Sequence, residues 1–275
     1  MALLSYLRST RDLLANLSAN RRLTWALAKR DMSDEHVGQS FGVGWAIVQP
    51  LLMMGIYLFV FTFVFATRLE DAPNPHLDYS VYLFSGLIPW LTLSLVLGRA
   101  PTIVVNNTSL VKQVALPVEI LPVKSLFGPF VFFCVVATFS VFYALVSSGG
   151  QLALTTLLLP ALTLLLFMLA VGLSLLLSCL GAFFRDTREI VNVFLNAGLF
   201  ILPILYKPGW LPPALAWVIS FNPFSAVVWC WQDALYYGAF AHPGAWVANV
   251  ILSVVALTVG ARIFMTAKDY FGDVL

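Results

Sequence analysis

The feature that most constrains this chain is a long stretch without any charged residue, from Trp45 to Ala66. An α-helix rises about 1.5 Å per residue and the hydrocarbon core of a bilayer is about 30 Å thick, so roughly twenty apolar residues can cross it. Five more charge-free stretches follow, at residues 81–98, 125–147, 149–184, 190–206 and 234–261. The sequence therefore predicts an all-α polytopic membrane protein with six transmembrane helices.

The distribution of charge supports this prediction. Only 10% of the 275 residues are charged, whereas soluble domains carry about 25%. With six spans, thirteen of the fifteen basic residues fall on the side that holds both termini: Arg8, Arg11, Arg21, Arg22, Lys29, Arg30, Arg99, Lys112, Lys124, Arg185, Arg188, Arg262 and Lys268. Basic loops stay in the cytoplasm, so we expect both termini to be cytoplasmic.

Residues 1–36 form a polar segment before the apolar six-span part at 37–275. Leucines recur in it near helical spacing, with Arg21, Arg22, Lys29 and Arg30 between them. This pattern predicts an amphipathic helix, broken or continuous, that lies at the cytoplasmic membrane interface with its basic side chains toward anionic headgroups. The alternative is an amphipathic helix packed on another subunit.

Residues 208–237 are apolar but interrupted by four prolines. The pieces Leu211–Phe221 and Phe224–Tyr237 are too short to cross a bilayer. They predict a re-entrant helical hairpin on the external side, between spans five and six. One full extra span is the alternative, but it would move the carboxyl terminus outside and remove the charge asymmetry.

The sequence lacks the residues that several kinds of catalytic or binding chemistry require. No GxxxxGK[ST] loop is present, so the chain has no ATP site of that form. His36, His76 and His242 fall in separate loops, which predicts solvated side chains and no metal site. The sequence shows no set of Ser, His and Asp residues that would indicate a hydrolase. The three cysteines predict no structural disulfide. None of the predicted spans holds the titratable group that ion-coupled transporters use.

Several short strings, in order and spacing, resemble the membrane subunit of ATP-binding-cassette polysaccharide exporters, the family of O-antigen, capsule and teichoic-acid export permeases. The strings cover most of the chain from about residue 22. They are Lys29-Arg30-Asp31, Gly38 to Trp45, Gln49-Pro50, Gly86 to Trp90, Ser109 to Lys112, Leu116 to Pro122, Phe184-Arg185-Asp186, Leu202 to Tyr206 and Asn222-Pro223-Phe224.

This resemblance implies a homodimer in the bacterial inner membrane that moves a lipid-linked polysaccharide. A separate ATPase in two copies would bind ATP and Mg²⁺, and this chain would bind no cofactor and no nucleic acid. The segment 106–122 resembles a cytoplasmic coupling helix, 185–189 a gate helix and 208–237 an external gate. The implied residues are Ser109, Lys112, Pro117 and Glu119 for coupling; Phe184, Arg185, Asp186, Arg188 and Glu189 for the cytoplasmic gate; and Tyr206, Trp210, Trp217, Asn222, Pro223, Trp229 and Trp231 for the external gate and glycan path.

Two other functions stay open from the sequence. One is an exporter of the same architecture for a small amphiphile or drug. The other is a membrane-embedded glycolipid enzyme, which would need paired catalytic groups that the sequence does not show. The sequence also departs from the family pattern, with Val118 and Gln232 where the family commonly has arginine.

Overall fold

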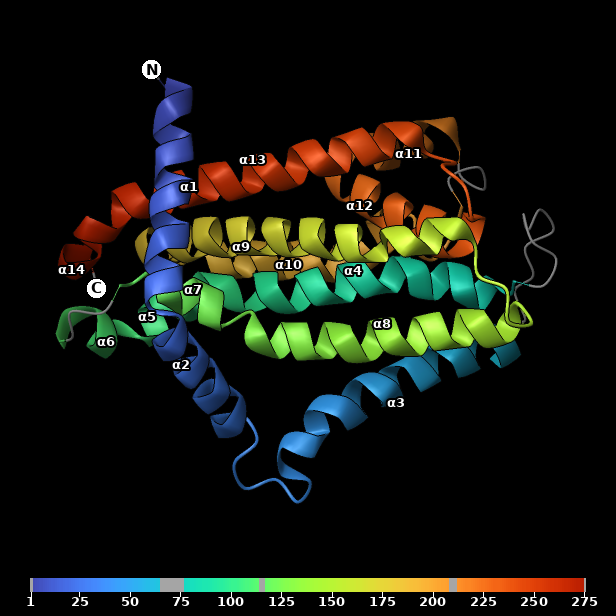
Figure 1. Ribbon diagram of the computed structural model, residues 1–275, viewed down its shortest axis with the longest axis horizontal. Coiled ribbons are helices and arrows are strands. Elements are labelled where there is room, and N and C mark those ends of the chain that lie inside the picture. The colour runs from blue at the N-terminus through green and yellow to red at the C-terminus, as the bar shows by residue number, and fades with distance from the viewer. Residues whose placement is uncertain (1, 65–76, 114–116, 208–211, 275) are drawn as a thin grey trace.

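The computed structural model describes residues 2–64, 77–113, 117–207 and 212–274, and its regular structure there is helical throughout. The long helices run along one axis, while α1 and α2 cross the bundle near one end (Figure 1). The helices are α1 (Ala2–Ala19), α2 (Arg21–Asp34), α3 (Trp45–Phe59), α4 (Tyr79–Arg99), α5 (Ile103–Asn106), α6 (Thr108–Gln113), α7 (Ile120–Lys124), α8 (Phe127–Ser147), α9 (Leu159–Phe183), α10 (Thr187–Ile201), α11 (Pro213–Phe221), α12 (Pro223–Gln232), α13 (Pro243–Ala267) and α14 (Phe271–Val274). Short 3₁₀ turns η1 (Gly42–Gly44), η3 (Ala100–Thr102), η4 (Leu154–Leu158) and η7 (Lys268–Tyr270), and π-helical turns η2 (Val60–Val64) and η6 (Asp233–Tyr237), extend them.

Five continuous helical segments within the described residues are long and apolar enough to cross a membrane. They are Gly42–Phe63, Tyr79–Asn106, Ile120–Ser147, Leu154–Phe183 and Pro243–Tyr270. The shortest of them has 22 residues, which at about 1.5 Å per residue spans the hydrocarbon core. The chain is therefore a multi-pass helical membrane protein.

Two of the six predicted spans differ from the structure. The predicted span 190–206 corresponds to α10, which has only 15 residues and ends where Leu202 turns extended, as the residue before Pro203 favours. The predicted span 234–261 is wrong at its start. Gly238, with φ of 66°, ends the preceding helical turn, and the last long helix begins at Pro243.

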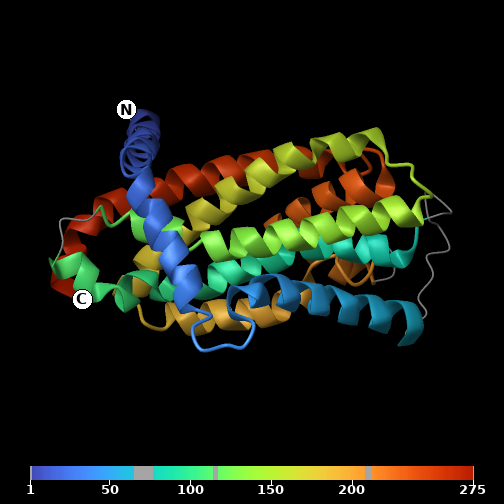
Figure 2. The ribbon, with the colours of Figure 1, turned by 60° about the horizontal axis from the view of Figure 1, so that its bottom comes forward.

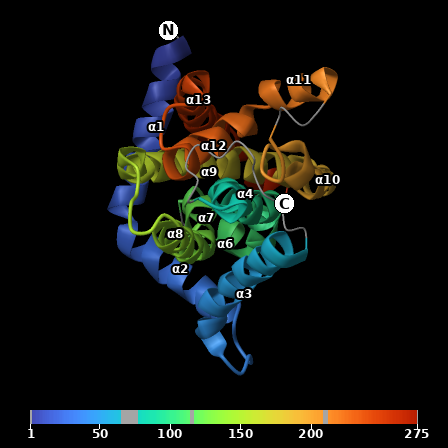
Figure 3. The same cartoon turned by 90° about the vertical axis from the view of Figure 1, so that its right-hand side faces the viewer.

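Helix α4 lies at the centre of the bundle, with α3 and α13 on opposite sides of it in the end view of Figure 3. In the most apolar stretch of the segment that contains α4, 78% is buried inside the structure, whereas in that of the segment that contains α3 only 11% is buried. Among the described residues, α9 and α13 make the most extensive contact between two helices. There a Cβ added at Gly260 would lie 2.1 Å from the backbone oxygen of Gly172, so the two glycines let the backbones touch.

The amino-terminal segment is two helices, as the broken form of the prediction allows. The break is at Asn20, whose φ and ψ of −104° and 20° are not helical. Helix α1 packs on α13, and α2 packs on α7 and α8. The side chain of Leu13 is fully buried, whereas Arg21, Arg22, Lys29 and Arg30 are all exposed. The two helices form a slanting band across the end of the bundle that holds the carboxyl terminus (Figure 2).

Candidate functional site

The polar contacts of the molecule concentrate where α1 and α2 cross the bundle. We call this region the polar junction. It comprises Asn16 of α1, Asp31 of α2, Glu35 after α2, Arg99 of α4, Glu119 before α7, Lys124 of α7 and Lys268 of η7. Each contact joins segments that are at least 64 residues apart in the chain. The junction therefore ties the amino-terminal helices to the ends of the long helices.

Glu119 has the most buried carboxylate of the junction. Its side chain is 1% exposed, and Asn16 Nδ2 donates a hydrogen bond of 2.6 Å to its Oε1. Lys268 Nζ lies 3.4 Å from the same oxygen. A buried carboxylate is tolerated when charge and hydrogen bonds compensate it, and here α1 and η7 supply both.

Two further ion pairs hold α2 against the bundle. Lys124 Nζ lies 2.8 Å from Asp31 Oδ2, and the lysine side chain is 5% exposed. Arg99 Nη1 lies 2.5 Å from Glu35 Oε1, with both side chains about two-fifths exposed. The lysine of the first pair is therefore shielded from water, whereas its Asp31 partner and both members of the second pair are partly solvated.

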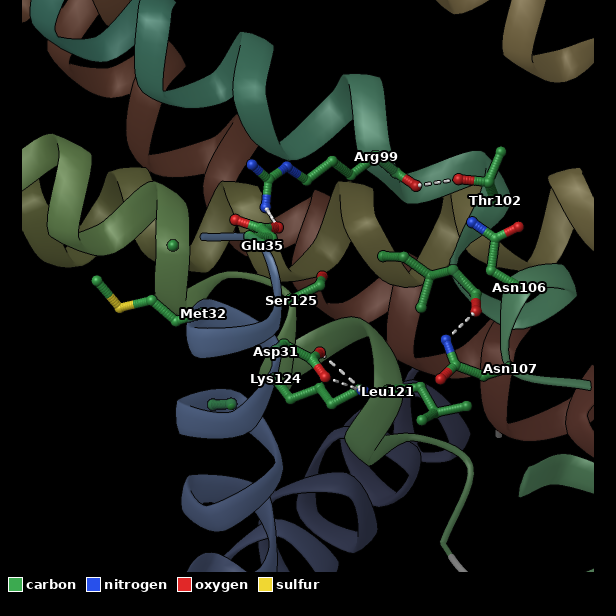
Figure 4. Close-up of a pocket in the computed structure, with 13 residues that line it drawn as sticks. Asp31, Met32, Glu35, Arg99, Thr102, Asn106, Asn107, Leu121, Lys124 and Ser125 are labelled. Atoms are coloured by element: carbon green, nitrogen blue, oxygen red, sulfur yellow. Dashed lines mark hydrogen bonds and ion pairs between the residues drawn. The ribbon is translucent and has the colours of Figure 1, made fainter. Parts of the chain in front are cut away.

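A cavity of about 380 Å³ lies between these two ion pairs. Figure 4 shows Asp31 and Lys124 on one side, Glu35 and Arg99 on another, and Asn106 and Asn107 toward α5. The cavity is lined by both polar and apolar groups, and Ala28, Leu121 and Gly128 complete its wall. Its carboxylates face their own basic partners, and the part of the chain that the structure describes holds no group of three His, Cys, Asp or Glu side chains suited to a metal ion. The arrangement suits mechanical connection and offers no catalytic set.

The four predicted coupling residues do not share one surface. Ser109 and Lys112 are exposed on α6, while Pro117 is half-buried. Glu119 is buried in the polar junction, so it does not face a docking partner. Residues 106–122 also do not form one helix, because α5 ends at Asn106, α6 spans Thr108–Gln113 and α7 starts at Ile120. Residues 114–116 lie outside the described part.

The predicted gate segment 185–189 is not a helix of its own. Arg185 and Asp186 form a turn, and α10 begins at Thr187. The five predicted gate side chains are nevertheless all exposed at the start of α10: Phe184, Arg185, Asp186, Arg188 and Glu189. An outward apolar row continues along α10 through Ile190, Val193 and Phe200.

The predicted external residues also separate. Trp217 is 64% exposed and stacks on Phe221, with ring centroids 5.1 Å apart. Trp231 is buried against Phe133, so it does not line an open path. Its ring lies on the α12 face that packs into the core.

The other external residues have structural contacts. Asn222 caps α12, since Phe224 N donates to its Oδ1 at 3.0 Å, and Pro223 takes the first helical position. Tyr206 is half-buried, and its hydroxyl donates to the carbonyl of Phe200. Trp210 falls at residues 208–211, outside the described part.

A second buried carboxylate lies beyond α12, and it corrects the expectation for His242. Asp233 is fully buried, with the backbone N of His242 and Nε1 of Trp246 each donating to its Oδ2 at 3.0 Å. His242 Nδ1 lies 2.8 Å from Oδ1, and its ring stacks on Trp229 at 5.0 Å. His242 is therefore part of a fixed clasp between η6 and α13, which differs from the solvated loop side chain expected from the sequence.

Comparison with known proteins identifies the family of this chain. A sequence profile described as ABC-2 type transporter matches residues 22–236, from α2 to the end region of η6. The chain belongs to the ABC-2 type transporter family. Among curated relatives of this ABC-2 chain is an O-antigen export system permease protein RfbA of Klebsiella pneumoniae, 24% identical over 90% of this chain and 93% of the relative.

Two further relatives cover most of their length as well. The RfbA permease of Myxococcus xanthus is 24% identical over 95% of this ABC-2 chain and 98% of its own. The polysialic acid transport protein KpsM of Escherichia coli is 22% identical over 83% and 86%. The profile match and these relatives confirm the family resemblance that the short strings indicate, and the relatives are permease or transport proteins.

The polar junction itself was not predicted. In the sequence, Asp31 belongs to the Lys29-Arg30-Asp31 motif and Lys124 to the charges that set the topology, and neither assignment indicates a contact; Asn16 belongs to no motif. Their partners lie 93 and 103 residues away in sequence, so no local spacing could pair them. In this ABC-2 transporter, the one sequence feature that favours these contacts is that opposite charges occur in segments expected on the same side of the membrane.

Proposed function

We propose that this chain is the channel-forming permease subunit of an ATP-driven exporter that moves a lipid-linked polysaccharide across the bacterial inner membrane. The observation that carries the proposal is the family match together with near full-length similarity to O-antigen and polysialic acid permeases. The sequence has no nucleotide-binding loop, so a separate ATPase in two copies would bind ATP and Mg²⁺ and drive the movement.

The ATPase would dock on α6. Ser109 and Lys112 are the exposed polar side chains of the predicted coupling segment, and α6 lies at the end of the bundle where the polar junction and the carboxyl terminus lie (Figure 1). Glu119 follows α6 after a few residues and bonds to α1 and η7. A push on α6 would therefore pass through Glu119 to the amino-terminal helices.

Two copies would form the channel. Helix α3 has little cover in one chain, and the outward row on α10 at Ile190, Val193 and Phe200 has none. A second copy would cover such apolar faces. In this arrangement, α10 and residues 202–206 together form the fifth membrane crossing, which keeps both termini on the cytoplasmic side. The second copy would shield the short helix α10 and the non-helical residues after it from lipid.

The external gate would be formed by α11, α12 and η6. The stacked pair of Trp217 and Phe221 is exposed on α11, and flat aromatic faces suit the apolar faces of sugar rings. Tyr206 and Trp229 stay candidates for the path because both are partly exposed. The amphipathic pair α1 and α2 would lie at the cytoplasmic interface, with its exposed arginines toward anionic headgroups.

Deletion of the gene, with expression of the partner ATPase kept intact, tests the function. We expect loss of surface polysaccharide and accumulation of lipid-linked glycan inside the cell. Unchanged surface glycan would reject the proposal, and export of a small amphiphile by the purified complex without any glycan defect would replace it.

Substitution of Lys112→Glu tests the docking surface separately. Because Lys112 is exposed, the variant should fold and insert normally while it loses co-purification of the ATPase. Arg30→Glu, at an exposed position on α2, is the matched control. Equal ATPase recovery from Lys112→Glu and Arg30→Glu would remove α6 from the proposed interface.

A further inference from the structure

An apolar groove of about 350 Å³ lies where α2 crosses α8 and α9. Its walls include Phe127 and Phe130 of α8 and Phe167 and Val171 of α9. Trp25 of α2 forms the opposite wall, 59% exposed, and meets the ring of Phe127 edge-on at 4.8 Å. The groove is separate from the polar cavity, although Ala28 and Lys124 contribute to both.

The rim of the groove carries one uncompensated positive charge. Lys124 is paired with Asp31, and the Thr24 hydroxyl donates to the carbonyl of Asn20. Arg21 lines the groove and is exposed, and within the described residues it has no ion pair. An anion at the rim would therefore meet a free guanidinium.

The position of the groove fits the headgroup boundary of a bilayer. Phe127 is the first residue of α8, within one of the membrane-spanning segments, and α2 crosses the bundle there (Figure 2). The aromatic walls extend from this level along α8 and α9. An exposed apolar channel that starts beside an unpaired arginine matches a lipid, with its chain against the rings and its phosphate at the rim.

We propose that this groove binds one acyl chain of an anionic glycerophospholipid of the cytoplasmic leaflet, whose phosphate pairs with Arg21. The net charge decides the occupant: a zwitterionic lipid also offers a phosphate, but its ammonium group lies beside that phosphate and repels Arg21, whereas an anionic lipid leaves the attraction unopposed. The inference needs only the membrane-spanning fold, so it stands or falls independently of polysaccharide export. The bound lipid would hold α2 against α8 from the membrane side, as the ion pairs hold it from the polar cavity.

Fluorescence quenching of Trp25 tests the proposal on the full chain. The protein is placed in phosphatidylcholine vesicles with increasing fractions of brominated phosphatidylglycerol or of brominated phosphatidylcholine. The difference between the native chain and Trp25→Phe isolates the signal of this ring from the other seven tryptophans. We expect the anionic lipid to bind about fivefold more tightly than the zwitterionic one.

Variants at two neighbouring arginines decide the role of the charge. Arg21→Gln should bring the two lipids close to equal affinity, and Arg21→Lys should keep the preference. Arg22→Gln, which lies outside the groove but on the same interface helix, should lower the preference less than Arg21→Gln does. Equal quenching by both lipids in the native chain would overturn the proposal. So would a preference that survives Arg21→Gln, or a Trp25 signal that neither lipid quenches, as when a second copy covers the groove.

Discussion

The buried carboxylate of Glu119 gives the sharpest prediction about the polar junction. In Glu119→Ala, Asn16 loses a hydrogen bond to a charged acceptor, which is worth about 1.5 to 3 kcal/mol. Lys268 loses its partner at 3.4 Å, but its side chain is 26% exposed, so water replaces much of that attraction and the loss stays under about 1 kcal/mol. We therefore expect Glu119→Ala to destabilise the protein by about 2 to 3 kcal/mol.

Thermal unfolding of the purified chain in detergent measures this effect. At about 2 to 4 °C per kcal/mol, Glu119→Ala should lower Tm by about 5 to 10 °C. Asn16→Ala should cost nearly as much, because it leaves the buried carboxylate with one partner, and Lys268→Ala should cost a similar amount, because it leaves the buried carboxylate without its cation. Glu189→Ala removes an exposed carboxylate and should change Tm little.

A double-mutant cycle separates the contact from the rest. Asn16→Ala combined with Glu119→Ala should cost less than the sum of the two single changes. Additive effects would refute the assignment of Asn16 as a partner of Glu119. Glu119→Arg would place a cation beside Lys268 at a buried position, so a loss of export in this variant would report misfolding and could not by itself demonstrate coupling.

Three other contacts give predictions of the same kind. Asp31→Ala leaves the nearly buried Lys124 unpaired and should lower the free energy of unfolding by about 3 kcal/mol. Lys124→Met leaves the half-exposed Asp31 in contact with water and should lower it by under about 1 kcal/mol. Equal losses of stability in the two variants, measured by thermal unfolding, would contradict the difference in burial. Asp233→Ala removes a fully buried carboxylate that accepts from His242 N and Trp246 Nε1 and should cost about 3 kcal/mol. Asp269→Asn, at an exposed carboxylate, is the control. A normal Tm of Asp233→Ala would show that the clasp contributes nothing. Gly260→Ala places a methyl group against the backbone of Gly172 and should destabilise the protein by at least about 2 kcal/mol. In the control Gly244→Ala, the added methyl group meets open space. Equal stability of the two variants would contradict the close packing of α9 on α13.

The fold was predictable where a single physical constraint acts along the chain. Charge-free runs of sufficient length located α3, α4, α8 and α9, because lipid excludes charge over a fixed thickness. Hydropathy could not place the ends of α10 and α13, since Leu202 and Gly238 end helices through backbone geometry inside apolar sequence. Proline and glycine positions carried that signal more reliably than hydropathy did.

The site was less predictable because its contacts are long-range. The resemblance pointed to Ser109, Lys112 and Glu119 as one functional group, but a motif does not tell which side of a segment faces solvent. The structure buries Glu119 and exposes the other two. The same limit applies to the aromatic residues predicted for the external gate, since Trp217 and Trp231 look alike in sequence, yet Trp217 is exposed and Trp231 is buried in the core.

The placement of charge in the polar junction bears on how movement would pass through the molecule. Apolar contacts alone would hold α2 on α7 and α8, but they would tolerate sliding, whereas the Asp31 to Lys124 contact at 2.8 Å fixes one register. The chain then runs from α7 directly into α8, and Glu119, one residue before α7, is tied to α1. A displacement of α6 therefore cannot move α7 without moving the amino-terminal helices and the start of α8 together. If the ATPase docks on α6, the first response of the membrane part is a joint movement of these segments, and the Asp31→Ala chain should lose transport while it still binds the ATPase.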